Sequence, residues 1–397
     1  MIAKSIREQV EKSSVIRQMF EEGARRAALY GAQNVFDFSL GNPNVPAPES
    51  VNASIKEIIE NRESTKIHGY MNNAGFPEVR KTIAESLNKK YATTFTEENI
   101  IMSVGAAGGM NSILKSVLDP GDEVVVLAPF FGEYTNYVAN FSGKLVVVPP
   151  NPPEFRPDAE ALSKAITKKT KAVIINNPNN PTGVVYNEED IKKMTAVISE
   201  KSAEYGTDIA LISDEPYREL VYDGREVPFL TKYYQNTFIC YSYSKSLSLP
   251  GERIGYIVIP DEMKDSEAVR SAVTVATRIL GYVNAPSLMQ LAVAANADAE
   301  VNVAAYDKNR QALYKGLTEL GFECVKPEGA FYLFMKSPID DEKTFCDLAK
   351  EENILLVPGS AFGCPGYVRI AYCVAYETII NSMTGFKRLA TSLGIIQ

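Results

Sequence analysis

Short apolar runs alternate with helix-length segments through the middle of the chain, from about residue 50 to residue 285. The runs predict strands at 99–104, 123–127, 171–176, 208–213, 237–241 and 254–259, and the clearest helices between them are expected at 105–118 and 187–205. Near-continuous apolar strands that alternate with helices are typical of a mostly parallel sheet buried on both faces. The pattern therefore predicts an α/β fold, with a large domain whose mostly parallel central sheet is covered by helices on both faces.

The pattern changes towards the C-terminus. A helical stretch over about 285–320 is followed by expected strands at 322–325, 330–335, 354–357 and 367–372 and by expected helices at 342–351 and 376–393. This order indicates a smaller α+β domain. At the other end, residues 1–30 have the pattern of a charged, partly amphipathic helix, and the turn-rich segment 41–48 follows. We expect an N-terminal arm (1–48) that packs with a small C-terminal domain (286–397), and a large domain over 49–285.

Composition narrows the class of protein. Apolar residues make up 45% of the chain and charged residues 23%, which is ordinary for a folded globular protein. The formal charge is -8, so no basic surface is expected to attract nucleic acid. Residues 1–20 are charged throughout, and the longest apolar runs are too short to span a bilayer. The five cysteines are widely spaced and include no CxxC pair, which favours reduced thiols. We therefore expect a cytoplasmic protein with no nucleic-acid or membrane partner.

The chain contains one histidine, His68. A zinc site of the HExxH type and a histidine cluster are both excluded, and no metal is expected. A Ser-His-Asp triad would have to use His68, and no nucleophile-elbow motif supports one. A general base is therefore expected among the Lys, Asp, Glu and Tyr residues.

Polar residues follow several of the predicted strands directly. In an open α/β sheet, ligands bind outside the carboxyl ends of the strands, so these residues are expected to meet at one edge. The strand ends carry, in chain order, Gly105, Ala106 and Ala107, then Asn180, then Asp214 and Tyr217, and then Ser242, Ser244 and Lys245.

Each of these residues alone has an ordinary structural explanation, such as a tight turn, a helix cap or an exposed lysine. Together they match the needs of one cofactor. The small residues at 105–107 open a helix whose free N–H groups can hold a phosphate. A lysine near that phosphate can form a Schiff base with an aldehyde, and a carboxylate beside a pyridine nitrogen keeps this nitrogen protonated. The set therefore predicts a site for pyridoxal 5′-phosphate.

Four motifs that occur in order carry a resemblance to a known family. They are Asn180-Pro181-Thr182-Gly183, Asp214-x-x-Tyr217, Ser242-x-Ser244-Lys245 and Gly251-Glu252-Arg253-Ile254-Gly255-Tyr256. The chain resembles the fold-type-I, pyridoxal-phosphate-dependent aminotransferases of class I/II, of the aspartate-aminotransferase-like kind. The resemblance extends from Ser39 to Tyr372.

The resemblance implies a role for each matching residue. Lys245 would bind the cofactor's aldehyde, Asp214 would pair with its ring nitrogen, and Asn180 and Tyr217 would bind its ring hydroxyl. Lys245, Asp214 and Tyr217 are the implied catalytic residues. The phosphate would be held around Gly105 by a set that comprises Ala106, Ala107, Ser242, Ser244 and Arg253. Arg369 would clamp the substrate's α-carboxylate, together with Asn180 and the backbone of Gly41. Members of the family form homodimers with shared active sites, and Tyr70 matches the tyrosine that reaches the partner's phosphate.

Two positions differ from the aspartate-type pattern. The chain has no tryptophan, and Phe131 takes the place of the residue that stacks on the cofactor ring. Arg278 lies near the position of an arginine that binds a distal carboxylate from the neighbouring subunit, although its spacing is one residue off. The resemblance therefore leaves the substrate open between acidic and aromatic amino acids.

The resemblance implies an aminotransferase that moves an amino group between an L-amino acid and a 2-oxo acid by a ping-pong mechanism. One alternative is a carbon–sulfur lyase with the same cofactor residues. A second is a non-enzymatic regulator that keeps the fold, although this chain has no spare length for a DNA-binding domain and no basic arm.

Overall fold

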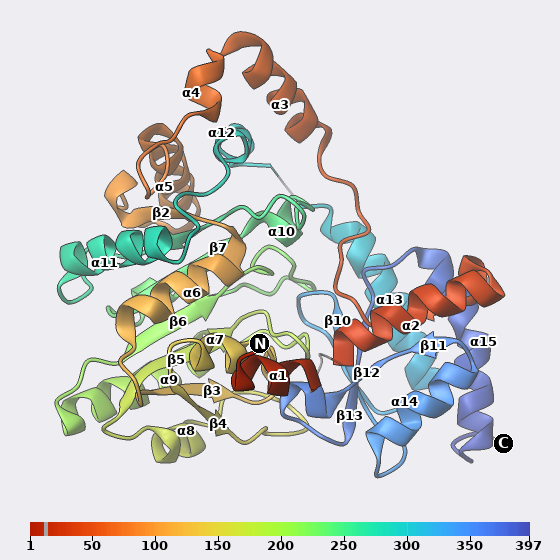
Figure 1. Cartoon of the computed structure of the whole chain (residues 1–397). Coiled ribbons are helices and arrows are strands. Elements are labelled where there is room, and N and C mark those ends of the chain that lie inside the picture. The colour runs from red at the N-terminus through yellow and green to blue at the C-terminus, as the bar shows by residue number, and fades with distance from the viewer. Residues whose placement is uncertain (12–14, 300) are drawn as a thin grey trace.

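A seven-stranded sheet forms the centre of the larger of two units (Figure 1). The computed structural model describes residues 1–11, 15–299 and 301–397. The strand order is β2-β8-β7-β6-β5-β3-β4, and β8 runs in the opposite direction to the other six strands. The strands are β2 (Ile100–Ser103), β3 (Glu123–Leu127), β4 (Lys144–Val148), β5 (Thr170–Asn176), β6 (Ala210–Asp214), β7 (Thr237–Ser242) and β8 (Gly255–Val258). The predicted α/β class and mostly parallel sheet are confirmed.

Alternate side chains of each central strand enter different cores. On β3, Val125 packs in a cluster with residues of α5 (Pro77–Tyr91) and α9 (Glu188–Tyr205). Its neighbours Val124 and Val126 pack with residues of α6 (Gly105–Val117) and α11 (Ser266–Ile279). The strict alternation follows from the two-residue period of a strand. Helices therefore cover both faces of the sheet, as expected.

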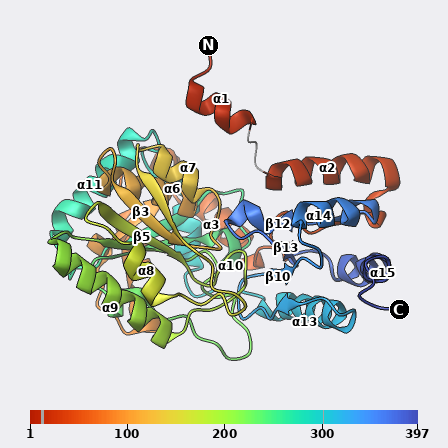
Figure 2. The same cartoon turned by 90° about the horizontal axis from the view of Figure 1, so that it is seen from below.

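The smaller unit combines two short sheets with helices. An antiparallel sheet has the order β12-β13-β10-β9, and β1 pairs with β11 in parallel. Its strands are β1 (Phe36–Asp37), β9 (Cys324–Val325), β10 (Tyr332–Lys336), β11 (Ile354–Leu355), β12 (Val357–Pro358) and β13 (Tyr367–Ala371), and the main helices are α2 (Val15–Tyr30), α13 (Val303–Glu319), α14 (Glu342–Glu351) and α15 (Tyr376–Ser392). Because β1 comes from the N-terminal arm and β11 from the C-terminal part, these two parts of the chain form the smaller α+β unit together. Figure 2 shows α2 beside α14 at the edge of this unit.

Several predicted elements need correction. The expected helical stretch over 285–320 is two helices, α12 (Ser287–Ala295) and α13, and the charged N-terminal segment contains α1 (Lys4–Glu11) and α2, with residues 12–14 outside the described part. Strand β4 had no counterpart in the prediction because it is an edge strand whose residues are partly exposed. The domain limits 1–48, 49–285 and 286–397 stay predictions. Packing of α12 against α3 (Glu49–Asn61) and α5 favours a boundary after α12.

Two features bear on the environment of the chain. Within residues 1–11, 15–299 and 301–397, no helix combines the length and apolar character needed to cross a membrane. All five cysteines are free, and four of them are buried.

Candidate active site

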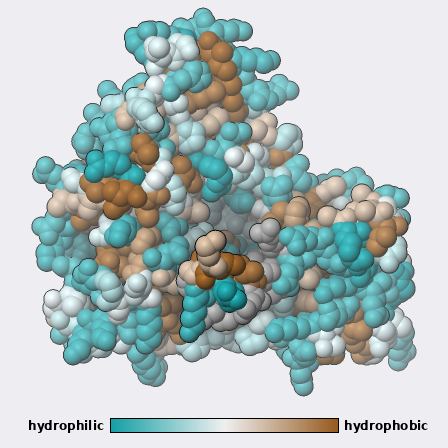
Figure 3. Space-filling model, in the orientation of Figure 1, coloured by the Kyte–Doolittle hydropathy of each residue, from teal (hydrophilic) through white to brown (hydrophobic). Residues whose placement is uncertain are grey.

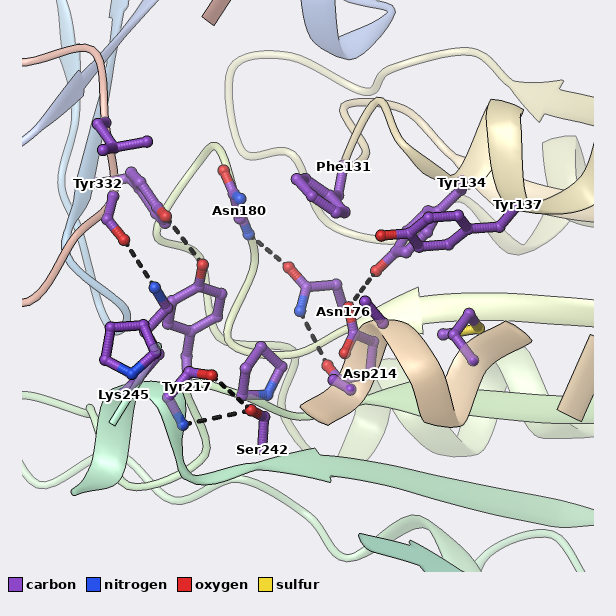
Figure 4. A pocket seen from close by; sticks show the side chains of 18 of the residues that line it. Phe131, Tyr134, Tyr137, Asn176, Asn180, Asp214, Tyr217, Ser242, Lys245 and Tyr332 are labelled. Atoms are coloured by element: carbon purple, nitrogen blue, oxygen red, sulfur yellow. Dashed lines mark hydrogen bonds between the residues drawn. The ribbon is translucent and has the colours of Figure 1, made fainter. Parts of the chain in front are cut away.

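The carboxyl ends of β5, β6 and β7 open into a cavity of about 250 Å³ between the two units (Figure 4). The larger unit contributes the residues that follow these strands. The smaller unit and the N-terminal arm contribute Arg369, Tyr332, Leu40 and Gly41. Parallel strands bring their carboxyl ends to the same edge of a sheet, which explains why motifs far apart in sequence meet here.

Asp214 ends β6 at the floor of this cavity. Its Oδ2 accepts a 2.6 Å hydrogen bond from the Tyr134 hydroxyl, while its Oδ1 is buried without a hydrogen-bond partner. Burial raises the pKa of Asp214 to about 7, the hydrogen bond from Tyr134 lowers it, and the neighbouring Glu215 raises it further. A buried carboxylate oxygen without a donor carries a desolvation cost, so a cationic N–H group is the ligand that this atom fits best.

Lys245 lies on the short helix α10 (Tyr243–Ser246), directly after β7. Its Nζ donates a 2.6 Å hydrogen bond to the carbonyl of Gly41 and lies 5.4 Å from the centre of the Phe331 ring. Burial lowers the pKa of Lys245 to about 8. A lysine with a lowered pKa has a larger neutral fraction near neutral pH, which is the form that attacks an aldehyde.

The N-terminus of α6 forms the wall beside Arg253. Gly105 has a φ of +73°, and a Cβ at this position would lie 2.6 Å from the guanidinium of Arg253. Ala106, Ala107 and Ser242 also face the cavity. Free N–H groups, a hydroxyl and a guanidinium around one hollow are the groups that bind a phosphate.

Arg369 on β13 faces the cavity from the smaller unit. It is 2% exposed, and burial lowers its pKa. Its two terminal nitrogens donate to the Asn180 side chain (3.0 Å) and to the Ser39 carbonyl (2.5 Å), while its Nε has no partner. Within the described residues, no carboxylate forms an ion pair with Arg369. A buried guanidinium with a free N–H is therefore available for a carboxylate ligand.

Residues 33–381 match the model of the family described as aminotransferase class I and II. The chain belongs to this family. It is 33% identical to an aspartate/prephenate aminotransferase of Thermus thermophilus over 88% of this chain and 90% of that protein. It is 31% identical to an aromatic-amino-acid aminotransferase of Thermococcus litoralis over 98% of both chains.

Solved structures agree with these sequence relationships. An amino transferase from Eubacterium rectale superposes with a TM-score of 0.96 and 47% identity, over 99% of both chains. An aspartate aminotransferase from Thermus thermophilus with maleate superposes with a TM-score of 0.86 and 28% identity, over 98% of this chain and 100% of that chain. The protein is thus an aminotransferase with the fold of aspartate aminotransferase.

Aminotransferases of this family use pyridoxal phosphate, and the cavity of this one fits it. The unpartnered Oδ1 of Asp214 provides an acceptor for a protonated ring nitrogen. The glycine at 105 keeps the helix N-terminus open towards Arg253, where a side chain would close the hollow. Lys245, whose pKa burial lowers to about 8, provides the amine for the aldehyde. The chain therefore has a matching group for the ring nitrogen, the phosphate and the aldehyde of the cofactor.

The structure brings most of the predicted residues of this aminotransferase to one cavity. They are Gly41, Ala106, Ala107, Phe131, Asn180, Asp214, Tyr217, Ser242, Ser244, Lys245, Arg253 and Arg369, all of which line it. Gly105 lies behind the lining, against Arg253. The ring of Phe131 stands edge-on to that of Tyr134, 5.6 Å away. The individual roles of these residues stay predictions.

Tyr70 and Arg278 lie outside the cavity. Tyr70 is 93% exposed, and Arg278 lies on the exposed face of α11. Both were expected to act on a neighbouring subunit, so their position in a single chain does not test their roles.

Among the lining residues that have no counterpart in the sequence analysis are three tyrosines: Tyr134, Tyr137 and Tyr332. The two tyrosines near 135 follow the motif around Phe131, but tyrosine is frequent in this chain and no spacing distinguishes them. Tyr332 lies on a strand of the smaller unit, and only the packing of the two units places it here.

Proposed function

We propose that this aminotransferase exchanges an amino group between acidic or aromatic L-amino acids and 2-oxo acids in the cavity around Lys245. The observation that carries the proposal is the buried guanidinium of Arg369, which has an unpartnered Nε and faces the same cavity as Lys245. An α-carboxylate is present in every amino acid and oxo acid, and it would complete the hydrogen bonds of this guanidinium.

Each residue contributes a separate function. Bound pyridoxal phosphate would supply an aldehyde for attachment of an amine and a ring that withdraws electrons. Asp214 would hold the ring nitrogen in its protonated form, with Tyr134 fixing the orientation of the carboxylate. Tyr217 and Asn180 would bind the ring hydroxyl. Lys245 Nζ, once the substrate amine has replaced it, would accept the proton from the substrate Cα and return a proton when the amino group is transferred.

The acidic or aromatic specificity depends on the residues that would face the substrate's side chain. The cations that line the cavity are Lys245, Arg253 and Arg369, and the proposal assigns each of them to another group. A distal carboxylate would therefore need a cation from outside this set, and Arg278 of the partner subunit is the candidate. The ring of Tyr137 suits an aromatic substrate equally well.

A homodimer is part of the proposal. Tyr70 is 93% exposed, as a residue that reaches a neighbouring active site would be. Large apolar side chains are also exposed on α3 and α11, at Ile59, Val275 and Ile279. Figure 3 shows hydrophobic residues gathered over these helices. Exposed apolar patches of this kind are typical of protein interfaces.

Two measurements test the function. The purified protein should be yellow, and borohydride should fix the cofactor to Lys245, as shown by peptide mapping. A label on another lysine would contradict the assignment of the site. Single-turnover bleaching by each amino acid would then identify the donors, and aspartate, glutamate and phenylalanine are expected among the fastest. If aspartate does not bleach the holoenzyme, the dicarboxylate part of the proposal is wrong.

The carbon–sulfur lyase alternative has a distinct outcome. A lyase would release pyruvate and ammonia steadily from a β-substituted amino acid without any oxo-acid acceptor. We expect turnover to require an oxo acid, because the second half-reaction restores the starting form of the enzyme.

A further inference from the structure

Tyr332 joins the two halves of the active site. It lies on β10 of the smaller unit, is 2% exposed, and places its hydroxyl 2.8 Å from the hydroxyl of Tyr217 on the larger unit (Figure 4). Tyr217 follows β6 and belongs to the predicted cofactor residues. The hydrogen bond therefore connects the unit that carries Arg369 to the unit that carries Asp214 and Lys245.

The ring of Tyr332 also packs against Arg369, the proposed ligand of the substrate's α-carboxylate. The guanidinium carbon of Arg369 lies 4.6 Å from the centre of the Tyr332 ring and 4.8 Å from that of Phe362. Two aromatic rings around a planar guanidinium stabilise its charge and restrict its rotation. The orientation of the Arg369 guanidinium thus depends on Tyr332.

A third contact involves the backbone that holds Lys245. A Cβ at Gly41 would lie 2.0 Å from the Tyr332 hydroxyl, so the hydroxyl packs directly against this glycine. The carbonyl of Gly41 accepts the hydrogen bond from Lys245. Tyr332 therefore contacts the segment that positions the reactive lysine as well as Tyr217 and Arg369.

The direction of the hydrogen bond between the two tyrosines follows from the number of protons. A phenol has one O–H proton, and Tyr217 would use its proton for the ring hydroxyl oxygen of the cofactor. Tyr217 can then only accept from Tyr332, so Tyr332 is the donor. A hydroxyl that accepts a hydrogen bond becomes a better donor, because hydrogen bonds in a chain polarise one another.

We propose that Tyr332 is a positioning residue that strengthens the hydrogen bond from Tyr217 to the cofactor through its hydroxyl and orients Arg369 for the α-carboxylate through its ring. The inference rests on the proposed function, which assigns the cofactor to Tyr217 and the carboxylate to Arg369. It predicts that the hydroxyl and the ring of one side chain affect different measurements.

Tyr332→Phe removes only the hydroxyl. With the cofactor bound to Lys245, Tyr217 would donate to the cofactor's ring oxygen and would compete for the lone pairs that hold the proton on the Lys245 nitrogen. A weaker hydrogen bond from Tyr217 would therefore raise the pKa of this nitrogen. We expect the midpoint of the pH titration of the visible absorption to rise by up to about one unit. The KM for the amino donor should change less than about twofold, because the ring remains beside Arg369.

Tyr332→Leu removes the ring as well. Loss of the aromatic contact should raise the KM for every amino donor about threefold to thirtyfold, beyond the effect of Tyr332→Phe. Tyr222→Phe is the matched control. Tyr222 is a buried tyrosine of the same core cluster, and its hydroxyl donates to the Ala330 carbonyl at 2.5 Å, away from the lining of the cavity. This variant should leave both the titration and the KM unchanged.

A double-mutant cycle with Tyr217→Phe keeps the test decisive if Tyr332→Leu does not fold. If Tyr332 acts through Tyr217, the double variant Tyr217→Phe/Tyr332→Phe should titrate like Tyr217→Phe alone. Additive shifts would overturn the inference, as would a titration of Tyr332→Phe that equals wild type while Tyr217→Phe is shifted. In both cases the proposed function would still hold. A wild-type protein that binds no pyridoxal phosphate would instead contradict the proposed function and the inference together.

Discussion

The active site has two sides that are built in different ways. On the cofactor side, Asp214 ends β6 and Lys245 follows the neighbouring parallel strand β7. The register of the strands aligns Asn176 with Asp214 and Asp214 with Cys240. On the substrate side, Arg369 reaches Asn180 across 189 positions of the chain and Ser39 across 330. One side depends on strand ends within a single sheet, and the other depends on the docking of the two units.

The two sides also differ in how their buried charges are compensated. Tyr134 partly satisfies Asp214 from the same unit, and burial raises the pKa of that carboxyl far enough for it to be protonated near neutral pH. Arg369 stays charged, and neutral oxygens and aromatic rings surround it. A buried arginine without a carboxylate is costly for folding alone. The carboxyl of Asp214 can therefore change its protonation state, whereas the buried charge of Arg369 is left for a ligand anion to compensate.

Lys245→Ala tests the cofactor side most directly. We expect transamination to fall by about 10⁴-fold or more, because the variant lacks both the amine that binds the aldehyde and the group that moves the Cα proton. Steady-state rates with saturating amino acid and oxo acid measure the loss. Lys192→Ala, at an exposed lysine of α9, should keep the wild-type rate. A residual rate above about one-hundredth of wild type would show that another base carries the proton.

Arg369→Lys tests the substrate side. An ammonium cannot reproduce the bidentate geometry of a guanidinium, so binding of the transition state should weaken by about 2–3 kcal/mol. This loss lowers kcat/KM by about 30-fold to 150-fold. The factor should be similar for aspartate, alanine and phenylalanine, since all share the α-carboxylate. A loss confined to one class of side chain would place Arg369 at the distal group instead.

Asp214→Asn tests, in the absence of cofactor, whether the buried carboxyl of Asp214 is protonated while Arg369 stays charged. The pKa of Asp214 is about 7 in the folded protein and about 4 in an unfolded chain. The folded state therefore binds a proton that the unfolded state has lost, and its stability falls as pH rises from about 4 to about 7.

The asparagine variant lacks this titration. Relative to wild type, its apoprotein should gain about 3 kcal/mol in the free energy of unfolding between about pH 4.5 and about pH 8, as measured by urea denaturation. Burial raises the pKa of Tyr222 above its ordinary value, outside this range, so Tyr222→Phe serves as the control with no such slope. Parallel pH profiles of the wild-type and Asp214→Asn apoproteins would show that Asp214 is ionised throughout.

Arg278→Ala gives the smallest expected effect and extends the substrate side beyond one chain. Because Arg278 is exposed, the free energy of unfolding of the protomer should change by less than about 0.5 kcal/mol. If the arginine of the partner subunit binds a distal carboxylate, kcat/KM for aspartate should fall about tenfold, while phenylalanine and alanine are unaffected. Equal losses for all three substrates would assign Arg278 to the interface alone.

The apolar pattern was sufficient to predict the α/β class, and the motifs were sufficient to predict most of the residues that line the cavity. Asp214, Tyr217 and Lys245 each stand within a few positions of a strand with a clear apolar run, and parallel strands must end at a common edge. Arg369 was also predicted, although through the family resemblance. Its alternation with Val368 and Ile370, which are buried in the core of the smaller unit, agrees with a strand that presents Arg369 to the other face.

Only the tertiary structure decided which groups surround these residues. The break between α12 and α13, the edge strand β4 and the tyrosines at 134 and 332 left no distinctive local pattern, because partial exposure and long-range packing determine them. The sequence alone determined which chemical groups are present and which of them follow strands, since the apolar period of a strand is local and parallel strands end at a common edge. The surroundings of Arg369 and the link through Tyr332 arise where the two units meet, and no segment of the chain contains that contact by itself.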